Sequence, residues 1–194
     1  MTFELPITTN QAADFLLAAV KAEVENRSGE FNDDMRGTIY KVAEFLTNKS
    51  KKHSLLMCGK CGNGKTTLLK AIQTTFSFLD IHDENNQKVI VLTQTAKSLN
   101  EKAKTDFNSF KRLCSAPLLA IDDLGCEPAE YNAYGNVITP LIDLLEHRYA
   151  GQLPTIITTN LKPSEIGERY GERIADRFRE IMEKITFTQN SYRC

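Results

Sequence analysis

The chain has 194 residues, which is enough for one domain with a sizeable hydrophobic core. Its 24 basic and 25 acidic residues nearly balance, so no overall charge indicates a nucleic-acid or membrane partner, and any DNA contact would need a local basic patch. No apolar run is long enough to span a membrane, and residues 1–4 do not begin a signal peptide, so we expect a cytoplasmic protein.

The first fifty residues predict two packed helices and no separate domain. Asn10 can cap a helix that extends to about Asn26, because apolar residues follow it at helical spacing. A second helix is predicted after residues 32–34, and a polar run at residues 48–52 follows it. We therefore expect a small helical extension over residues 1–49 and a main domain over residues 50–194.

Beyond residue 50, apolar strands alternate with helical segments. The predicted strands cover residues 53–58, 88–93, 117–121, 154–160 and 185–188. The predicted helices cover residues 67–75, 95–113, 136–149, a short segment from Pro163, and 172–184. This alternation predicts an α/β fold with a five-stranded, mainly parallel sheet flanked by helices, whose ligands bind at the carboxyl ends of the strands.

A phosphate-binding loop is predicted between the first strand and the helix that follows it. Residues 59–66 have a glycine, four further residues and then Gly-Lys-Thr. Backbone N–H groups of such a loop point at phosphate, and the helix start adds unpaired donors and the positive end of the helix dipole. We expect Lys65 to reach the β- and γ-phosphates of ATP and the Thr66 hydroxyl to bind Mg²⁺. The predicted nucleotide-binding residues are Gly59, Lys60, Cys61, Gly62, Asn63, Gly64, Lys65, Thr66 and Thr67.

Polar side chains follow two of the predicted strands where ligands are expected. Asp122 would bind Mg²⁺ through a water, and Asp123 would orient or deprotonate the attacking water. Asn160 could hold that water or contact the γ-phosphate. The structural alternatives are a solvated acidic turn and an ordinary turn-forming asparagine.

The five cysteines form an odd set without the spacing of a disulfide framework. Cys58 and Cys61 are spaced as C-x-x-C, but Cys61 lies inside the phosphate-binding loop and no second pair completes a zinc site. We expect reduced thiols, of which Cys61 is the candidate for redox sensitivity because nearby N–H dipoles favour a thiolate.

Several segments in this order resemble the AAA+ ATPases of the DnaC/DnaI helicase loaders and the IstB transposition helpers. They are residues 59–66, 119–125, 157–160, 171–177 and 191–193, and the resemblance covers about residues 50–193. It implies an AAA+-type P-loop NTPase fold, with ATP and Mg²⁺ as cofactors and an ATPase activity.

The resemblance also implies roles for individual residues. Asp122 and Asp123 match the acidic pair and Asn160 matches the first sensor. Arg173 and Arg177 match arginines that act as a sensor or as a finger to a neighbouring subunit's γ-phosphate, and their spacing of four puts them on one helix face. The alternative is a helix surface that forms salt bridges with its own acidic residues.

Some features depart from the family pattern. The two helices before residue 50 are too little to equal the additional domain with which such loaders grip a helicase, and no C-terminal helical lid is predicted. The pair Asp122-Asp123 replaces the common Asp-Glu, which favours slow turnover. Lys60 raises the alternative of a ParA/MinD-type dimer, but fifty residues precede the loop here, so we treat Lys60 as an exposed variable position.

The resulting hypothesis is an ATP-binding and slowly ATP-hydrolysing accessory factor of DNA replication or transposition. Its expected partners are single-stranded DNA, a replicative helicase or transposase, and further copies of itself in an ATP-dependent homo-oligomer. The alternatives are an ATP-switched protein-binding module with little turnover and a small-molecule P-loop kinase, whose Arg-rich lid has no counterpart in residues 124–160. Basic residues that could contact DNA are Lys49, Lys51, Lys52, Lys102, Lys104, Lys111 and Arg112.

Overall fold

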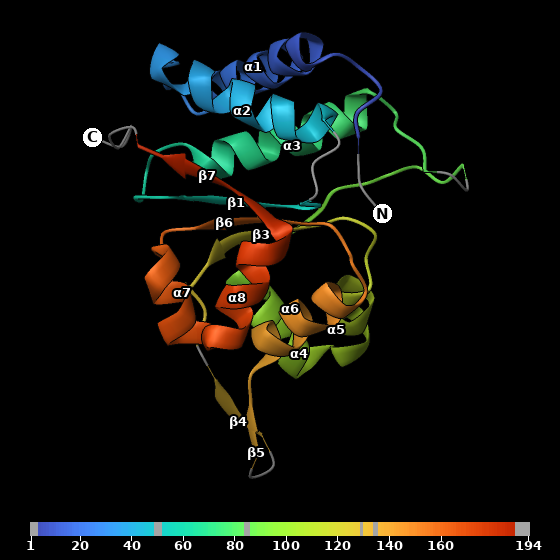
Figure 1. Cartoon of the computed structure of the whole chain (residues 1–194), viewed down its shortest axis with the longest axis vertical. Coiled ribbons are helices and arrows are strands. Elements are labelled where there is room, and N and C mark those ends of the chain that lie inside the picture. The colour runs from blue at the N-terminus through green and yellow to red at the C-terminus, as the bar shows by residue number, and fades with distance from the viewer. Residues whose placement is uncertain (1–3, 49–51, 84–85, 129, 134–135, 189–194) are drawn as a thin grey trace.

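A five-stranded sheet lies between two layers of helices (Figure 1). The computed structural model describes residues 4–48, 52–83, 86–128, 130–133 and 136–188. In the sheet order β2-β3-β6-β1-β7, all neighbouring strands are parallel, which confirms the predicted fold class. The strands are β1 (Ser54–Gly59), β2 (Leu92–Thr95), β3 (Leu119–Leu124), β6 (Thr155–Thr159) and β7 (Met182–Phe187).

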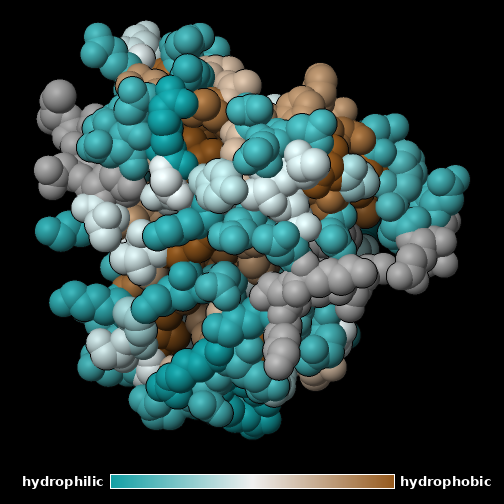
Figure 2. Space-filling model, turned by 45° about the horizontal axis from the view of Figure 1, so that its top comes forward, coloured by the Kyte–Doolittle hydropathy of each residue, from teal (hydrophilic) through white to brown (hydrophobic). Residues whose placement is uncertain are grey.

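Three helices cover one face of the sheet: α1 (Thr9–Glu25), α2 (Arg36–Thr47) and α3 (Lys65–Phe78), with a 3₁₀ turn η1 (Asp33–Met35) before α2. A capping box of Thr8 and Gln11 starts α1, so the predicted cap at Asn10 was two residues too late. The outer surface of this layer is mostly hydrophilic, with hydrophobic side chains in separate patches (Figure 2).

The N-terminal helices share one hydrophobic core with the sheet. Side chains of β1 alternate between the two layers, so that Leu55 and Met57 pack with α1, α2 and α3, whereas Leu56 packs with the opposite layer. Val20 of α1 and Val42 of α2 are fully buried in the first of these clusters. The division of the chain at residue 49 stays a prediction, since residues 49–51 lie outside the described part.

The second layer consists of α4 (Ala96–Thr105), α5 (Phe107–Cys114), α6 (Pro140–Ala150), α7 (Pro163–Tyr170) and α8 (Glu172–Ile181). Between β3 and α6 the chain forms an antiparallel hairpin of β4 (Tyr131–Ala133) and β5 (Asn136–Ile138). This hairpin projects from the body of the molecule beyond the second layer (Figure 1). The predicted helix over residues 136–149 was therefore wrong at its start, because the helix begins at Pro140, which suits the first helical position.

Three further predicted boundaries differ from the structure. The strand predicted at residues 88–93 begins only at Leu92, because the segment before it pairs elsewhere, with Val89 N donating to Ile81 O over 2.7 Å. The helix predicted over 95–113 is two helices, because Asp106 leaves helical geometry and caps α5 through a bond from Ser109 N. The last strand begins at Met182, three residues before its predicted start.

A buried arginine joins the amino ends of β3 and β6, opposite the predicted nucleotide site. Arg148 is 1% exposed and donates to the carbonyls of Ala116 and Pro154 and to the Thr155 hydroxyl, over 2.6–2.8 Å. Burial lowers the pKa of Arg148 to about 10. The contacts are to backbone and hydroxyl oxygens, so we assign this charge a structural role.

None of the helices in the described part of the chain combines the length and the hydrophobicity that crossing a bilayer needs.

Candidate functional site

The phosphate-binding loop connects β1 to α3, and its first glycine lies against the end of β7. A Cβ atom at Gly59 would lie 2.4 Å from Asn63 Nδ2 and 2.6 Å from the carbonyl oxygen of Phe187, so no other residue fits there. The fully buried Asn63 donates from Nδ2 to that Phe187 oxygen over 3.2 Å. The loop is thus held to the carboxyl edge of the sheet by one of its own predicted site residues.

The Lys65 amine lies at the centre of the loop. Its Nζ contacts four oxygen atoms over 2.8–3.1 Å, from Gly59 O, Lys60 O, Asn63 Oδ1 and Asn160 Oδ1. An ammonium group has three protons, so these acceptors share them. Burial lowers the pKa of Lys65. The structure therefore brings the predicted loop lysine and the predicted sensor asparagine into direct contact.

The predicted magnesium ligands also converge. Thr66 Oγ1 donates to Asp122 Oδ1 over 3.0 Å, and Asp122 is 7% exposed. The described residues contain no group of three or more His, Cys, Asp or Glu side chains that could hold a metal ion. A hydroxyl and one carboxylate nevertheless fit Mg²⁺, which keeps several waters and usually binds through one or two carboxylates together with substrate phosphates.

Thr158 is a site residue that the sequence analysis missed. Its hydroxyl donates to Asp122 Oδ1 over 2.6 Å and accepts from the backbone N of Asp123 over 2.8 Å. The side chain is completely buried in β6. Threonine is common in strands, so only its position two residues before Asn160 could have pointed to this role.

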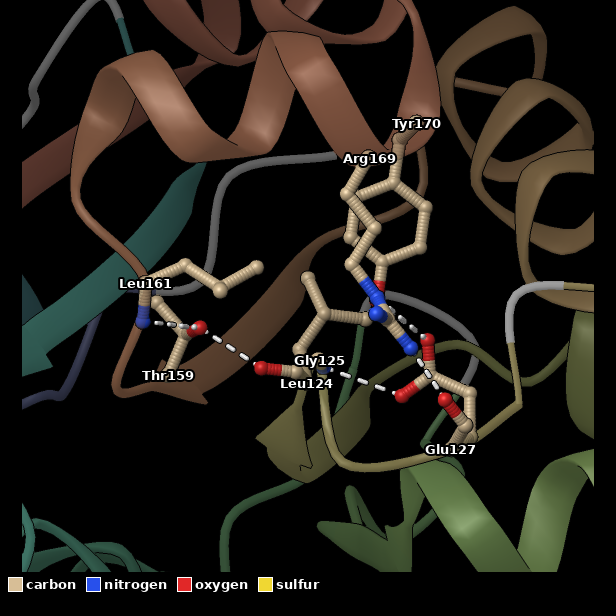
Figure 3. Close-up of polar contacts among 7 residues, drawn as sticks. All are labelled: Leu124, Gly125, Glu127, Thr159, Leu161, Arg169 and Tyr170. Atoms are coloured by element: carbon tan, nitrogen blue, oxygen red, sulfur yellow. Dashed lines mark hydrogen bonds and ion pairs between the residues drawn. The ribbon is translucent and has the colours of Figure 1, made fainter.

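A β-bulge separates the directions of the two acidic side chains. Ile121 pairs with Ile157 and Leu124 with Thr159, so two residues of β3 lie opposite one residue of β6. Asp123 has φ of +56°, in the left-handed region. Asp122 faces Thr66, whereas Asp123 lines the cavity beside the loop. A second threonine supports the end of the bulge, since Thr159 Oγ1 donates to Leu124 O over 2.6 Å (Figure 3).

A cavity of about 440 Å³ opens beside these residues, which is within the size range of small-molecule and cofactor sites. One wall consists of residues 61–67 with Asp123, Cys126 and Asn160. The opposite wall comes from the end of α1 and the segment that leads into η1, which the sequence analysis did not assign to the site. Its residues are Val24, Arg27, Gly29, Glu30, Phe31, Asn32 and Met35.

Two predicted site residues lie away from this cavity. Arg173 and Arg177 of α8 both form ion pairs with Glu146 of α6, over 3.3 and 3.0 Å. The Arg173 side chain is 72% exposed, whereas that of Arg177 is 16% exposed and lies over the Tyr149 ring, 4.5 Å from its centroid. The salt-bridge alternative thus holds in part, with a partner on another helix.

The remaining predictions concern the loop surface and the ends of the chain. Lys60 and Cys61 are exposed, and the four described cysteines are free thiols. Burial, reinforced by the Asp123 charge, raises the pKa of Cys126 beside the cavity. The predicted segment 191–193 and the predicted DNA contacts Lys49 and Lys51 lie outside the described residues.

The chain is similar in sequence to one replicative helicase loader. It is 26% identical to the replicative helicase loader DnaI of Bacillus subtilis (strain 168) in an alignment of 156 residues, which covers 75% of this chain and 48% of that protein. The chain therefore spans about half the length of the relative that it matches. No family model matches the sequence.

Solved structures share the fold. A crystal structure of the DnaC helicase loader matches with a TM-score of 0.61 at 21% identity, covering 81% of this chain and 92% of that chain. A crystal structure of DnaI matches with a TM-score of 0.62 at 21% identity, covering 96% of both chains. The replication initiator DnaA, bound to AMPPCP and single-stranded DNA, matches with a TM-score of 0.58 at 19% identity, covering 82% of this chain and 48% of that chain.

These likenesses confirm the AAA+ P-loop NTPase fold and the predicted resemblance to DnaC/DnaI-like proteins. The resemblance to the IstB helpers stays a prediction.

Proposed function

We propose that this DnaC/DnaI-like AAA+ protein binds ATP with Mg²⁺, hydrolyses it slowly, and serves as an accessory factor in DNA replication. The observation that carries the proposal is the convergence of Lys65, Asp123 and Asn160, from separate segments of the chain, on one cavity, whose lining residue Thr66 donates to Asp122. Each of these side chains ends or follows a parallel strand, where α/β sheets bind their ligands.

The chemistry that we propose is positioning and charge neutralisation, with little covalent work for the protein. Lys65 moves from its loop carbonyls and Asn160 to the β- and γ-phosphates, where its charge offsets theirs. Thr66 and Asp122 hold the magnesium ion, which when bound would neutralise charge on the phosphates. Asp123 orients the attacking water from the same side as the freed Asn160 carboxamide.

The cavity wall formed by the end of α1 and the η1 segment suits the nucleoside. We assign the base to the surroundings of Phe31 and Met35, because an aromatic ring and a thioether offer apolar contact to a purine. Arg27 lines the same wall, and its Nη1 lies 3.5 Å from the hydroxyl oxygen of Thr67 in α3. In this assignment the N-terminal extension completes the nucleotide site.

We also propose that subunits assemble with ATP and that Arg173 reaches the γ-phosphate in a neighbouring subunit. Arg173 is largely exposed and is not among the residues that line the cavity of its own chain, which supports a role across an interface. Arg177, largely covered between Glu146 and the Tyr149 ring, holds α8 against α6 instead.

A DNA contact is proposed for the surface of α4 and α5. Lys102 and Lys104 lie on α4, and Lys111 and Arg112 lie on α5. Phe107 is 55% exposed, and Lys111 Nζ lies 4.9 Å from the centre of its ring. Basic side chains beside an exposed aromatic ring suit single-stranded nucleic acid, whose bases stack on such rings.

Because the matched relative is a replicative helicase loader, we propose a replicative helicase as the protein partner, with a transposase as the alternative.

Steady-state ATP hydrolysis with and without single-stranded DNA, measured beside light scattering, tests this function. We expect turnover that rises with DNA and with assembly. Tight ATP binding to a monomer that ignores DNA would contradict the loader-type ATPase and favour an ATP-switched module that acts on a protein. A phosphorylated product from a panel of nucleosides would instead revive the small-molecule kinase.

A further inference from the structure

A buried carboxylate, that of Glu127, lies three residues beyond the end of the bulge at Leu124 and has no part in the chemistry proposed above. The Glu127 side chain is 1% exposed and accepts a hydrogen bond from Gly125 N over 2.9 Å. It also accepts from the Tyr170 hydroxyl and forms an ion pair with Arg169, whose Nε lies 3.6 Å from Oε1 (Figure 3). Arg169 donates in addition to the backbone oxygen of Glu127.

These contacts join the loop after the acidic pair, residues 125–128, to the last turn of α7. A buried carboxylate is unfavourable unless it is paired and hydrogen-bonded, and both of these α7 side chains supply what Glu127 needs. Burial and the bond to Glu127 raise the pKa of Tyr170 well above its usual value, so its hydroxyl keeps its proton and remains a donor. These contacts therefore hold the 125–128 loop in one position against α7.

The same loop controls the backbone of Asp123. Cys126 N donates to Asp123 O over 3.1 Å, which closes a tight turn between the acidic pair and Glu127. Gly125, with φ of +103°, packs so closely on Leu161, two residues before α7, that a Cβ atom would lie 2.8 Å from Leu161 Cδ1. Asp123 and Cys126 both line the cavity. A displacement of Glu127 would thus move Asp123.

The helix that holds Glu127 also connects two proposed functional groups. It starts three residues after Asn160, and it packs against α8, which carries Arg173. Because α7 contacts both α8 and the 125–128 loop, a movement of α8 at an interface would shift α7 and, through it, this loop.

We propose that Glu127 is a positioning residue, which fixes Asp123 by holding the 125–128 loop on Arg169 and Tyr170 of α7. The inference rests on the proposed ATPase function. It makes the orientation of the attacking water depend on where α7 and α8 lie, and so links turnover to contacts that a neighbouring subunit or partner makes with α8.

The test compares Glu127→Gln and Tyr170→Phe with a matched control, Glu180→Gln. Glu180 also accepts from a tyrosine hydroxyl, that of Tyr149 over 2.6 Å, but this pair is exposed and lies between α6 and α8. For each protein, three quantities are measured: amide hydrogen exchange of residues 122–128, the dissociation constant of AMPPCP with Mg²⁺, and kcat for ATP. A thermal melt gives the folded fraction.

In Glu127→Gln we expect exchange of residues 122–128 to rise about tenfold or more, because the loop opens more often. We expect kcat to fall about 10- to 100-fold, as for a displaced catalytic group, while AMPPCP binding changes less than about twofold. Tyr170→Phe should act in the same direction with a smaller effect, and Glu180→Gln should match the unmodified protein.

If Glu127→Gln showed the same amide exchange and the same kcat as the control Glu180→Gln, the proposal would be overturned. A fall in kcat that merely follows the unfolded fraction would also overturn it, since that is a structural effect alone. If Glu127→Gln does not fold, Tyr170→Phe decides, because it removes a single hydroxyl. The exchange measurement needs no nucleotide, whereas unmodified protein that binds no AMPPCP would contradict the proposed function itself.

Discussion

The Thr158 hydroxyl bonds to both members of the acidic pair: it donates to Asp122 Oδ1 over 2.6 Å and accepts from Asp123 N over 2.8 Å. The bulge interrupts the β3–β6 ladder at Asp123, and the Thr158 hydroxyl supplies the acceptor for the Asp123 N–H in place of a backbone oxygen of β6. The strand that ends near Asn160 therefore also sets the geometry of the two carboxylates.

Removing this hydroxyl should impair turnover more than folding. Thr158→Val keeps the shape but removes the hydroxyl that accepts from the part-buried Asp123 N–H, which we expect to cost about 1–3 kcal/mol of unfolding free energy. We expect kcat for ATP to fall about tenfold or more, because Asp122 and Asp123 lose their common support. Urea unfolding and steady-state kinetics measure the two effects. Thr158→Ser keeps the hydroxyl and should restore most of the activity; equal loss in both variants would show that the methyl packing matters instead.

The cavity wall at Phe31 should contribute to nucleotide affinity. If the base contacts this ring, Phe31→Ala should weaken AMPPCP binding by about 1–3 kcal/mol, the range of aromatic stacking on bases. Isothermal titration with Mg²⁺ present measures the change. The control is Phe78→Ala, which removes a ring that is 71% exposed and lies tilted against Phe15, outside the cavity. Unchanged affinity in Phe31→Ala would place the base elsewhere.

Arg173 and Arg177 should have separable effects. Arg173→Ala should change stability by less than about 1 kcal/mol, because exposed ion pairs contribute little, yet it should abolish the increase of hydrolysis on assembly. Arg177→Ala should lower stability more, since it removes a largely covered ion pair and a cation–π contact. Chemical denaturation and hydrolysis against protein concentration provide these values.

A mixing experiment makes the claim about Arg173 specific. In mixed oligomers, a Lys65→Ala subunit can lend its Arg173 to the intact nucleotide site of an Arg173→Ala subunit. The mixture should therefore recover hydrolysis that neither variant shows alone, and its failure to do so while oligomers form would argue against a finger acting between subunits.

Stability should decrease in mild acid through His53. Burial lowers the pKa of this histidine from its usual 6.5, and its Nε2 has no hydrogen-bond partner among the described residues. Below pH 6.5 the unfolded chain binds the proton more readily than the folded one. Stability therefore decreases as the pH is lowered from 6.5, until the pH is below the folded-state pKa. Urea unfolding at pH 7 and pH 5 should show a smaller decrease in His53→Gln; an identical decrease would assign the effect to other groups.

The sequence predicted that residues 59–66, the pair Asp122 and Asp123, and Asn160 would lie together, because each of them follows or ends a strand. Gly59, Lys65 and Asp122 occupy positions where a parallel sheet collects its ligands, so their convergence followed from the order of the elements. Boundaries set by tertiary contacts were predicted less well. Val89 belongs to an apolar run typical of a strand, yet it pairs with Ile81 and lies outside the sheet.

The residues that the sequence analysis missed are those whose roles depend on contacts between distant segments. Thr158 has the composition of an ordinary strand residue, and Phe31 lies in a polar connection between two helices. Glu127 follows the acidic pair closely, but its burial depends on Arg169 and Tyr170, more than forty residues later. No periodicity or motif in this sequence carries that information.

The most direct test of the account is Mg²⁺-dependent ATP binding and hydrolysis by the unmodified chain beside Lys65→Ala and a control, Lys70→Ala. Lys70 lies on the same helix, exposed, in an ion pair with Glu23 outside the loop. We predict that the unmodified chain and Lys70→Ala bind and hydrolyse ATP alike, and that Lys65→Ala loses about 100-fold or more of the hydrolysis, because a buried charge at the phosphates is removed. Hydrolysis by Lys65→Ala at the unmodified rate would contradict the assignment of this loop as the ATP site.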